Sequence, residues 1–333
     1  MSAPPSSAPE LSVVVPVFNE GGNVEALAAR LAPVLDRAVA SWEVLLIDDG
    51  SRDDTLSRAK GLNERDPRFR TVSFSRNFGK EIAIAAGLDH ARGRAVVIMD
   101  ADLQHPPEMI ETFVAHWREG YAMVFGQRTD READGPIRRA LTRAFYRLFA
   151  AFGETPLPDG AGDFRLLDRK AVDALRAMGE RARFSKGLYA WIGFRSKGVP
   201  FDVAQRASGT SKFNARKLFR FAFDGITSFS TLPLKLWTYV GVVVSACAFV
   251  LAMYFVIDTL MRGVDVPGYA SLIVSVMFFS GVQLISLGII GEYIGRIFAE
   301  VKRRPLYIVG DRVGFDEPDP ASVWVARDER RRA

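Results

Sequence analysis

Two acidic segments, V-L-L-I-D-D at residues 44–49 and V-V-I-M-D-A-D at residues 96–102, decide the fold class. Each begins with a short apolar run rich in Val or Ile, which is typical of a strand buried in a parallel sheet. Each ends in carboxylates, and ligands of open α/β sheets bind outside the carboxyl ends of the strands. The two segments therefore predict one polar site at one edge of a sheet. The alternative is that these are ordinary loop acids in contact with solvent. That alternative explains one acidic pair at a strand end more easily than it explains two.

Strand-like and helical runs alternate from residue 11 to about residue 130. The strand-like runs are 11–18, 42–47, 69–74, 95–99 and 122–125, and the helical patterns between them lie near 22–39, 53–65, 80–91 and 106–118. This alternation predicts an open parallel sheet with helices on both faces. Polar residues follow all five strand-like runs, which supports a site at the carboxyl edge.

The spacing of Asp100 and Asp102 is suited to binding one hard cation. In an extended segment, residues two apart face the same way. Carboxylates together with phosphates suit Mg²⁺ or Mn²⁺. The chain has no G-x-G-x-x-G after its first strand and no G-x-x-x-x-G-K-[ST]. A metal and basic side chains would therefore have to carry the charge of any bound diphosphate.

Residues 135–230 show a less regular pattern with two further polar motifs. Residues 159–165, D-G-A-G-D-F-R, place Asp163 in a predicted glycine-rich turn. Residues 206–212, R-A-S-G-T-S-K, combine cations and hydroxyls and suit a phosphate. Ordinary surface loops remain the alternative for both motifs. The aromatic and basic residues of 211–235 predict helices in a membrane interface, with core packing of a small helical pair as the alternative.

Two long apolar runs predict a membrane hairpin. Residues 236–257 and 269–291 carry no charge over about the length that crosses a bilayer. A buried core helix is the alternative, but such helices are rarely apolar on all sides. The expected membrane helices are 236–257 and 269–293, and the short connection between them places both outer ends on one side. Basic residues flank the pair, so that side is expected to be the cytoplasm.

Composition is consistent with this organisation. Lys and Arg number 44 against 39 Asp and Glu, and the basic residues gather beside the apolar runs, which indicates a membrane surface rather than nucleic acid. Cys247 is the single cysteine, so no intrachain disulfide can form. The expected domains are a disordered segment 1–10, a catalytic domain 11–210, the interfacial segment 211–235, the two membrane helices and a cytoplasmic segment 294–333.

The motifs together resemble family 2 glycosyltransferases with a GT-A fold, and more narrowly the polyisoprenyl-phosphate glycosyltransferases. The matching segments are V-V-V-P-V-F-N-E (13–20), I-D-D-G-S (47–51), S-R-N-F-G-K-E (75–81), M-D-A-D-L-Q-H-P-P-E (99–108), G-D-F-R-L-L-D-R (162–169) and R-x-x-G-x-S-K (206–212). The resemblance implies an α/β fold of the GT-A (Rossmann-like) kind, a mostly parallel sheet with flanking helices, followed by interfacial helices and a two-helix transmembrane hairpin. The Q-x-x-R-W motif of the processive members is absent, which argues against polymer synthesis.

The resemblance also implies roles for individual residues. The positions matching the nucleoside pocket are Pro16, Asn19, Glu20, Asp48 and Asp49. The positions matching the metal and diphosphate site are Asp100, Asp102 and Gln104. The basic positions matching the donor site are Lys80 and Arg128. The positions expected to hold a phosphate of the donor or the lipid are Arg206, Ser211 and Lys212. Asp163 matches the acid usually assigned beside the acceptor, so it and Asp102 are the expected catalytic residues.

The activity implied is one inverting sugar transfer from a nucleotide diphosphate sugar to a polyisoprenyl phosphate, with Mg²⁺ or Mn²⁺. UDP-glucose or a related UDP-sugar and undecaprenyl phosphate are the expected substrates, with GDP-mannose as an alternative donor. A metal-dependent phosphohydrolase and a non-enzymatic flippase partner are the rival functions.

The expected location is the inner (cytoplasmic) membrane, as a multi-pass protein with its catalytic domain and both termini in the cytoplasm. Gly288, Gly291 and Gly295 in the second apolar run permit close helix packing, within the hairpin or between subunits. A homo-oligomer, a tetramer as in similar proteins, is expected.

Overall fold

The fold is known from a computed structural model, which describes residues 8–128, 161–180, 185–201, 232–262 and 268–315. Contacts within the chain divide it into two compact units, and each is described by itself. The larger contains an eight-stranded sheet, and the smaller contains two long helices. Residues 206–212 and the expected interfacial segment up to residue 231 lie outside the described residues.

The sheet is mixed, with more parallel than antiparallel pairs. Its strands are β1 (Leu11–Val17), β2 (Trp42–Asp48), β3 (Phe69–Phe74), β4 (Ala95–Ile98), β5 (Met123–Arg128), β6 (Ala161–Asp168), β7 (Ser196–Phe201) and β8 (Val309–Val313). The strand order is β7-β5-β6-β4-β1-β2-β3-β8. Strands β4, β1, β2 and β3 are mutually parallel, as the alternating pattern predicts. Strand β6 runs antiparallel to β4 and β5, and β8 runs antiparallel to β3, so the sheet is mostly parallel, as the resemblance to the GT-A fold implies.

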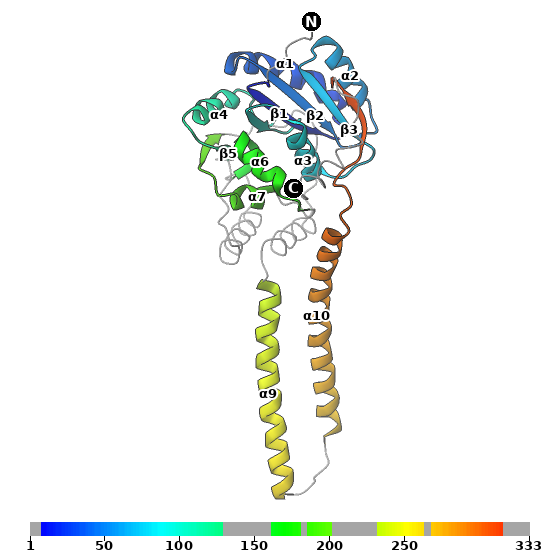
Figure 1. The fold of residues 1–333 in the computed structure, drawn as a ribbon. Helices are drawn as coiled ribbons and strands as arrows, with labels where there is room; N and C mark the ends of the chain where they lie inside the picture. The colour runs from blue at the N-terminus through cyan, green and yellow to red at the C-terminus, as the bar shows by residue number, and fades with distance from the viewer. Residues whose placement is uncertain (1–7, 129–160, 181–184, 202–231, 263–267, 316–333) are drawn as a thin grey trace, which may run out of the picture. The chain divides into compact units, whose positions relative to one another are not determined.

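Helices cover both faces of the sheet (Figure 1). They are α1 (Gly21–Ala38), α2 (Thr55–Arg65), α3 (Lys80–His90), α4 (Met109–Arg118), α6 (Arg169–Ala177) and α7 (Ser185–Trp191). Helices α1, α2 and α4 pack on one face, and α3 packs beside α6 on the other. The chain reverses its direction of winding at β1, because β2 and β3 lie on one side of it and β4 on the other. Such a switch point is where ligands bind in α/β sheets.

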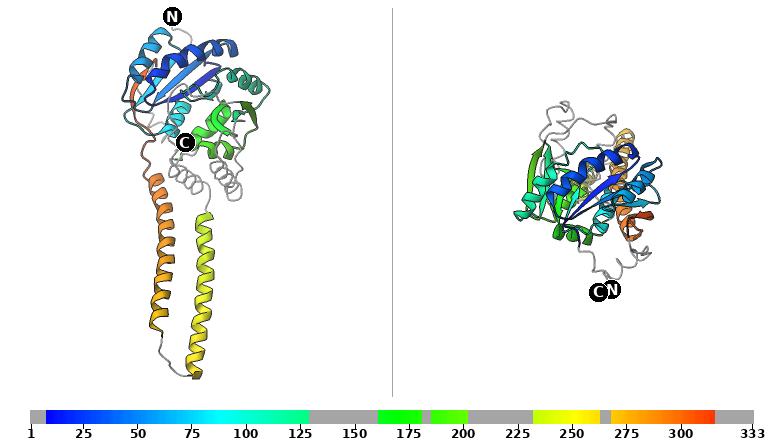
Figure 2. Two further views of the ribbon diagram at one scale, coloured as in Figure 1. Left: turned by 180° about the vertical axis from the view of Figure 1, so that it is seen from behind. Right: turned by 90° about the horizontal axis from the view of Figure 1, so that it is seen from above.

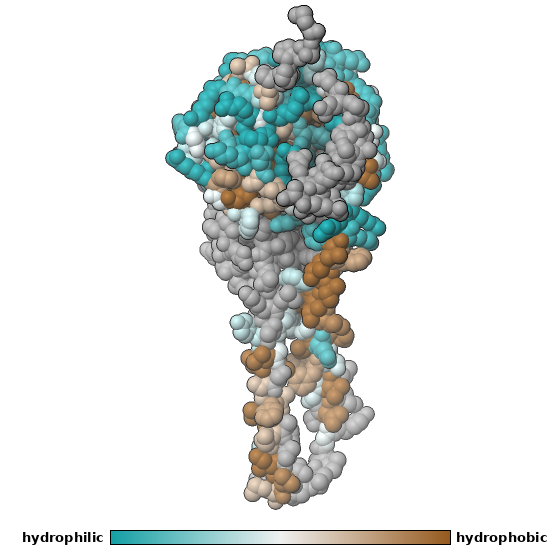
Figure 3. All heavy atoms as spheres, in the orientation of Figure 1, coloured by the Kyte–Doolittle hydropathy of each residue, from teal (hydrophilic) through white to brown (hydrophobic). Residues whose placement is uncertain are grey.

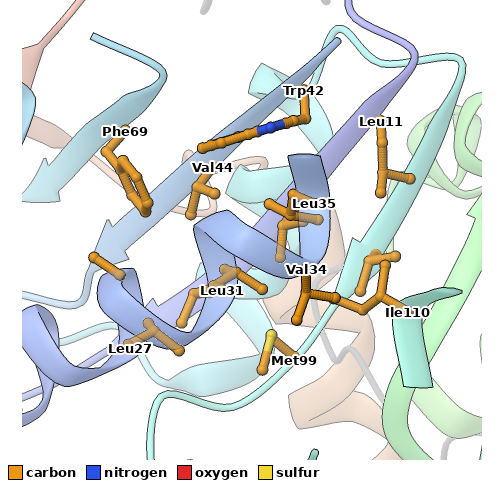
Figure 4. Close-up of a cluster of buried hydrophobic side chains, with 14 of the residues drawn as sticks. Leu11, Leu27, Leu31, Val34, Leu35, Trp42, Val44, Phe69, Met99 and Ile110 are labelled. Carbon is orange, nitrogen blue, oxygen red and sulfur yellow. The ribbon is translucent and has the colours of Figure 1, made fainter. Parts of the chain in front are cut away.

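The core explains why the strands read as continuous apolar runs. Every residue of β2 is buried, and alternate residues of β1 and β2 face opposite helix layers. Figure 4 shows the layer between α1 and the sheet, where Leu31 and Leu35 lie against Val44 and Trp42. Trp42 also contacts Phe69 edge to face, with ring centroids 5.6 Å apart. Burial on both faces is the expected state of central parallel strands.

The smaller unit contains α9 (Leu232–Arg262) and α10 (Tyr269–Val301), which lie side by side in Figure 1 and in the left view of Figure 2. Both contain the runs expected to be helical. Many large apolar side chains on them are exposed, and Figure 3 shows brown surface along both. Among the described residues, Phe278–Val301 is the one helical segment long and apolar enough to cross a membrane, and Gly241–Leu251 is a shorter apolar stretch.

Candidate active site

A cavity of about 210 Å³ opens at the switch point, beyond the carboxyl ends of β1, β2 and β4. It is lined by Pro16, Val17, Phe18, Glu20, Asp49, Lys80, Asp100, Ala101 and Asp102. Six of these residues are among those predicted from the sequence: Pro16, Glu20, Asp49, Lys80, Asp100 and Asp102. The structure therefore brings the two acidic segments to one site, as their positions at strand ends predict.

The loop after β1 is held to the loop after β2. Asn19 has a positive φ of 55°, a conformation that Asn tolerates better than most residues. Its backbone N–H donates to the Ser51 hydroxyl at 2.9 Å, and its side-chain oxygen Oδ1 accepts from the backbone N–H of Arg52 at 2.9 Å. The Glu20 N–H donates to the Thr55 hydroxyl at 3.0 Å. These bonds fix the wall of the cavity to which Glu20 belongs.

The two adjacent aspartates at the end of β2 have different positions. Asp48 is buried, accepts from the Ser73 hydroxyl at 2.7 Å and the Ser51 N–H at 3.0 Å, and does not line the cavity. Asp49 lines it and accepts from the N–H groups of Phe78 at 2.6 Å and Gly79 at 2.9 Å. Burial raises the pKa of Asp49 above its ordinary value. Asp48 thus stabilises the loop after β2 through buried hydrogen bonds. Asp49 lines the cavity and binds the loop before α3.

Lys80 joins the carboxylate of Asp100, which follows β4, to that of Asp163 in the neighbouring strand β6. Its Nζ lies 2.6 Å from Oδ1 of Asp100 and donates to Oδ2 of Asp163 at 3.0 Å. Burial by itself lowers the pKa of Lys80, but the two carboxylates outweigh it and hold the pKa above its ordinary value. Burial likewise opposes ionisation of Asp163, yet the charges of Lys80 and Lys186 hold its pKa below the ordinary value. The site therefore carries an ammonium paired with an ionised Asp163 at neutral pH.

The segment after β4 is a turn rather than an extended strand. Ala101 and Asp102 lie in the turn, and Leu103 has a positive φ of 58°. The alternation used to place Asp100 and Asp102 on one side therefore does not apply, although both line the cavity. Asp102 Oδ1 accepts from the Gln104 N–H at 3.1 Å, and Gln104 is not among the lining residues.

The residues present suit a cation that shares its ligands with a substrate. Within the described ranges, no three His, Cys, Asp or Glu side chains form a complete metal cage. Asp100 and Asp102 nevertheless line the same cavity. Mg²⁺ is commonly held by one or two carboxylates together with substrate phosphates and water. The two aspartates fit that mode of binding.

Asp163 lies in β6 and not in the glycine-rich turn predicted from its sequence. Its other carboxylate oxygen, Oδ1, is buried and has no hydrogen-bond partner among the described residues. The glycines on either side of Ala161 gave the appearance of a turn, but β6 is completed by pairing with β4 and β5. Such distant pairing has no local signal in the sequence.

A buried polar cluster beside Asp163 was not predicted from the sequence. Glu81 accepts hydrogen bonds from the N–H and the hydroxyl of Ser185, and burial raises the pKa of Glu81. The Arg165 guanidinium is buried, donates to the Gly162 carbonyl at 2.5 Å and lies 3.6 Å from the ring centre of Tyr189. Glu81 and Arg165 belong to two of the motifs that carry the family resemblance, S-R-N-F-G-K-E and G-D-F-R-L-L-D-R. Their charges close to Lys80 and Asp163 were the signal from which this cluster could have been predicted.

His105 also lies near the site and was not among the predicted residues. Its ring stacks on Phe164 with centroids 4.8 Å apart and meets Phe201 edge to face at 5.9 Å. Burial lowers the pKa of His105, so the ring is neutral at neutral pH. The ring anchors the end of the Asp102 loop to β6 and β7.

The remaining expected residues are placed only in part. Arg128 is the last residue of β5, at the end of that strand, and its side chain is not described. Arg206, Ser211 and Lys212 lie outside the described residues, so their expected phosphate contacts stay predictions.

The fold and the site together define an α/β protein whose carboxylates and one lysine surround a cavity at the switch point of its sheet. The chain belongs to the glycosyl transferase family 2, whose model matches residues 12–176. Residues 232–297 match a second family, the GtrB C-terminal hairpin. The chain is therefore a glycosyltransferase, and the resemblance stated from its motifs is confirmed.

Similar proteins match along nearly their whole length. An uncharacterised glycosyltransferase of Synechocystis sp. is 48% identical over 92% of this chain and 96% of its own. The putative glycosyltransferase CsbB of Bacillus subtilis is 44% identical over 90% of this chain and 91% of its own. The SfII prophage-derived bactoprenol glucosyl transferase of Shigella flexneri is 43% identical over 90% of this chain and 97% of its own.

Proposed function

We propose that this glycosyltransferase moves one sugar from a nucleotide diphosphate sugar to a polyisoprenyl phosphate. The observation that carries the proposal is the cavity in which Asp49, Asp100 and Asp102 meet Lys80, which in turn contacts Asp163. Relatives named bactoprenol glucosyl transferase support glucose as the sugar and undecaprenyl phosphate as the acceptor. UDP-glucose is the proposed donor.

The proposed reaction is a single inverting displacement. A phosphate oxygen of the acceptor attacks the anomeric carbon and forms a new C–O bond. The bond from that carbon to the diphosphate oxygen breaks, and the nucleoside diphosphate leaves with the electron pair. Lys80 is a fixed positive charge in the cavity, and such charges stabilise the negative charge that develops on a leaving diphosphate.

A divalent cation is proposed as the cofactor, held by Asp100 and Asp102 together with the donor diphosphate. When bound, it supplies charge neutralisation at the leaving group. The contact of Asp100 with the Lys80 ammonium, at 2.6 Å, means that this carboxylate already faces a positive charge. Mg²⁺ and Mn²⁺ both suit carboxylate and phosphate oxygens.

Asp163 is proposed to orient the acceptor rather than to remove a proton from it. A phosphate monoester has a second pKa near 6 and is largely dianionic at pH 7. The pKa of Asp163 lies below its ordinary value, so the carboxylate is a weak base. Its hydrogen bond with Lys80 allows Asp163 to hold the lysine ammonium beside the reacting groups.

The exposed apolar side chains of α9 and α10 support attachment to the membrane in which such a lipid resides. Two membrane crossings, a cytoplasmic catalytic domain and a homo-oligomer are part of the proposal. The domain limits 11–210 and 294–333 remain predictions.

The experiment that tests the proposal is incubation of the purified protein with undecaprenyl phosphate and one nucleotide sugar at a time. UDP-glucose, UDP-galactose and GDP-mannose form the panel, each with Mg²⁺ and with Mn²⁺. Mass spectrometry of the extracted lipid is expected to show a hexose added with UDP-glucose. A product only with GDP-mannose would contradict the assigned donor, and no lipid product with any donor would contradict the function.

A further inference from the structure

The segment that follows α10 in the chain returns to the sheet and borders the loop that holds Asp49. We call residues 304–315 the strap. Its strand β8 pairs antiparallel with β3, where Asp311 lies opposite Ser73 and Val309 opposite Phe74. The register shifts between Ser73 and Phe74, at the end of β3 nearest the cavity. Beyond that shift, the Ser75 N–H donates to the Ile308 carbonyl at 2.9 Å.

Tyr307 of the strap packs directly on the end of β3. It is 6% exposed, and its ring stacks on Phe74 with centroids 5.0 Å apart and planes 21° from parallel. Its hydroxyl donates to Oδ2 of Asp89 at 3.2 Å, which ties the strap to α3 as well. Tyr307 thus contacts both elements that flank the loop 75–79.

The contact continues from Phe74 into the loop. Phe74 meets Phe78 edge to face, with centroids 5.7 Å apart and planes at 90°. The N–H groups of Phe78 and Gly79 donate to the Asp49 carboxylate, which lines the cavity. The next residue, Lys80, begins α3 and reaches Asp100 and Asp163.

We propose that Tyr307 is a positioning residue, which fixes the 75–79 loop through Phe74 and Phe78 and thereby sets the affinity of the cavity for the diphosphate donor. The physical reason is that two amide donors must stay aligned on Asp49, while the loop's own contact with the Phe78 ring comes from Arg76, an exposed residue whose guanidinium lies 4.0 Å from the ring centre. A buried ring stack is rigid and supplies the missing support. The part that concerns donor affinity rests on the proposed function.

Hydrogen exchange of the full-length protein without ligand tests the positioning directly. In Tyr307→Ala, the amides of Phe78 and Gly79 are expected to exchange roughly three- to tenfold faster, the change that loss of one aromatic pair implies. Tyr307→Phe keeps the ring and should exchange like the wild type within about twofold. Asp311→Asn is the matched control, because it removes the ion pair of the strap with Lys60 and leaves the ring stack intact.

Donor binding is then measured by titration with UDP-glucose, and in parallel with GDP-mannose. Tyr307→Ala is expected to weaken binding of the donor that the wild type accepts by roughly three- to tenfold, with kcat at saturation nearly unchanged. Tyr307→Phe and Asp311→Asn should bind as the wild type does. If Tyr307→Ala does not fold, Phe78→Ala replaces it, because Phe78 is half-buried and its loss leaves the strap in place.

Unchanged exchange of the loop in the folded alanine variant would overturn the proposal. Faster exchange with unchanged donor affinity would overturn the link to the cavity. A wild-type protein that binds neither nucleotide sugar would refute the proposed function instead, and the exchange result would still decide whether the strap positions the loop.

Discussion

At the scale of single residues, the proposed function depends on one lysine placed between two carboxylates. Lys80 contacts Asp100 and Asp163, so a change at either acid alters the balance of charge in the cavity. Because folding lowers the pKa of Asp163 below its ordinary value of 3.8, its ionised form stabilises the fold above that pH. This stabilisation is lost as the pH falls through the lowered pKa. Across the physiological range Asp163 stays charged.

The first prediction concerns the role of Asp163. Asp163→Asn should retain a measurable rate, reduced by less than about a hundredfold at pH 7, because the acceptor phosphate needs little deprotonation. The defect should shrink as the pH rises through the second pKa of the acceptor, near 6. The measurement is single-turnover transfer from pH 5.5 to 8.5 with saturating donor and metal. No detectable activity at any pH, in a variant that still binds both substrates, would restore Asp163 as the base.

The second prediction concerns the metal. Asp102→Asn should abolish transfer and weaken Mn²⁺ binding in the presence of UDP by at least about tenfold, because a carboxylate ligand becomes a neutral amide. Electron paramagnetic resonance of free Mn²⁺ during a titration gives the affinity without any turnover. Asp311→Asn makes the same chemical change outside the cavity and should bind Mn²⁺ as the wild type does. Wild-type turnover by the Asp102 variant would remove the residue from the metal site.

At the scale of elements, the turn after β2 requires glycine at position 50. Gly50 has a φ of +69°, and an added Cβ would lie 2.5 Å from the carbonyl carbon of Arg76. The turn thus brings the loops after β2 and β3 together, next to the residues that bind Asp49. Any larger side chain has to separate them.

The third prediction compares two glycines. Gly50→Ala should lower the free energy of unfolding by about 2 kcal/mol or more, from the strained backbone and the backbone clash. Gly61→Ala lies within α2 with no atom near its added Cβ, and should raise the free energy of unfolding by about 0.4–1 kcal/mol. Urea unfolding of the two variants and the wild type gives both values. Equal stability of the two alanine variants would show that the close approach at Gly50 carries no cost.

The elements also show where sequence patterns succeed. Strands β1 to β5 and the helices between them were predicted because apolar runs, their length and the polar residues after them are local features. Strand β6 lacked that signal, because the glycines around Ala161 read as a turn and its strand partners lie far away in the sequence. Strand β8 reads as a polar segment and becomes a strand through pairing with β3. In the same way, Asp48 and Asp49 are equivalent in the sequence and both are buried, and only the fold shows that Asp49 lines the cavity and Asp48 does not.

At the scale of the whole molecule, the sheet unit carries the chemistry and the helical unit provides the apolar surface. The fourth prediction is that both termini and the catalytic domain face the cytoplasm. Basic residues precede the first apolar helix and follow the second, so they gather at the outer ends of the hairpin, which lie on the same side of the membrane. A reporter fused after Ala333 should be active only on the cytoplasmic side of the membrane. Activity of a reporter that functions only in the periplasm would reject this topology.

We propose that the cavity at the switch point is where a single sugar is transferred to a lipid phosphate. The most direct measurement is mass spectrometry of undecaprenyl phosphate after reaction with ¹³C-labelled UDP-glucose, with inorganic phosphate assayed in the same sample. We predict a lipid heavier by one labelled hexose with the wild type, none with Asp102→Asn, and no release of inorganic phosphate. Undecaprenol accompanied by inorganic phosphate, in place of the glycosylated lipid, would contradict the account and indicate a phosphohydrolase.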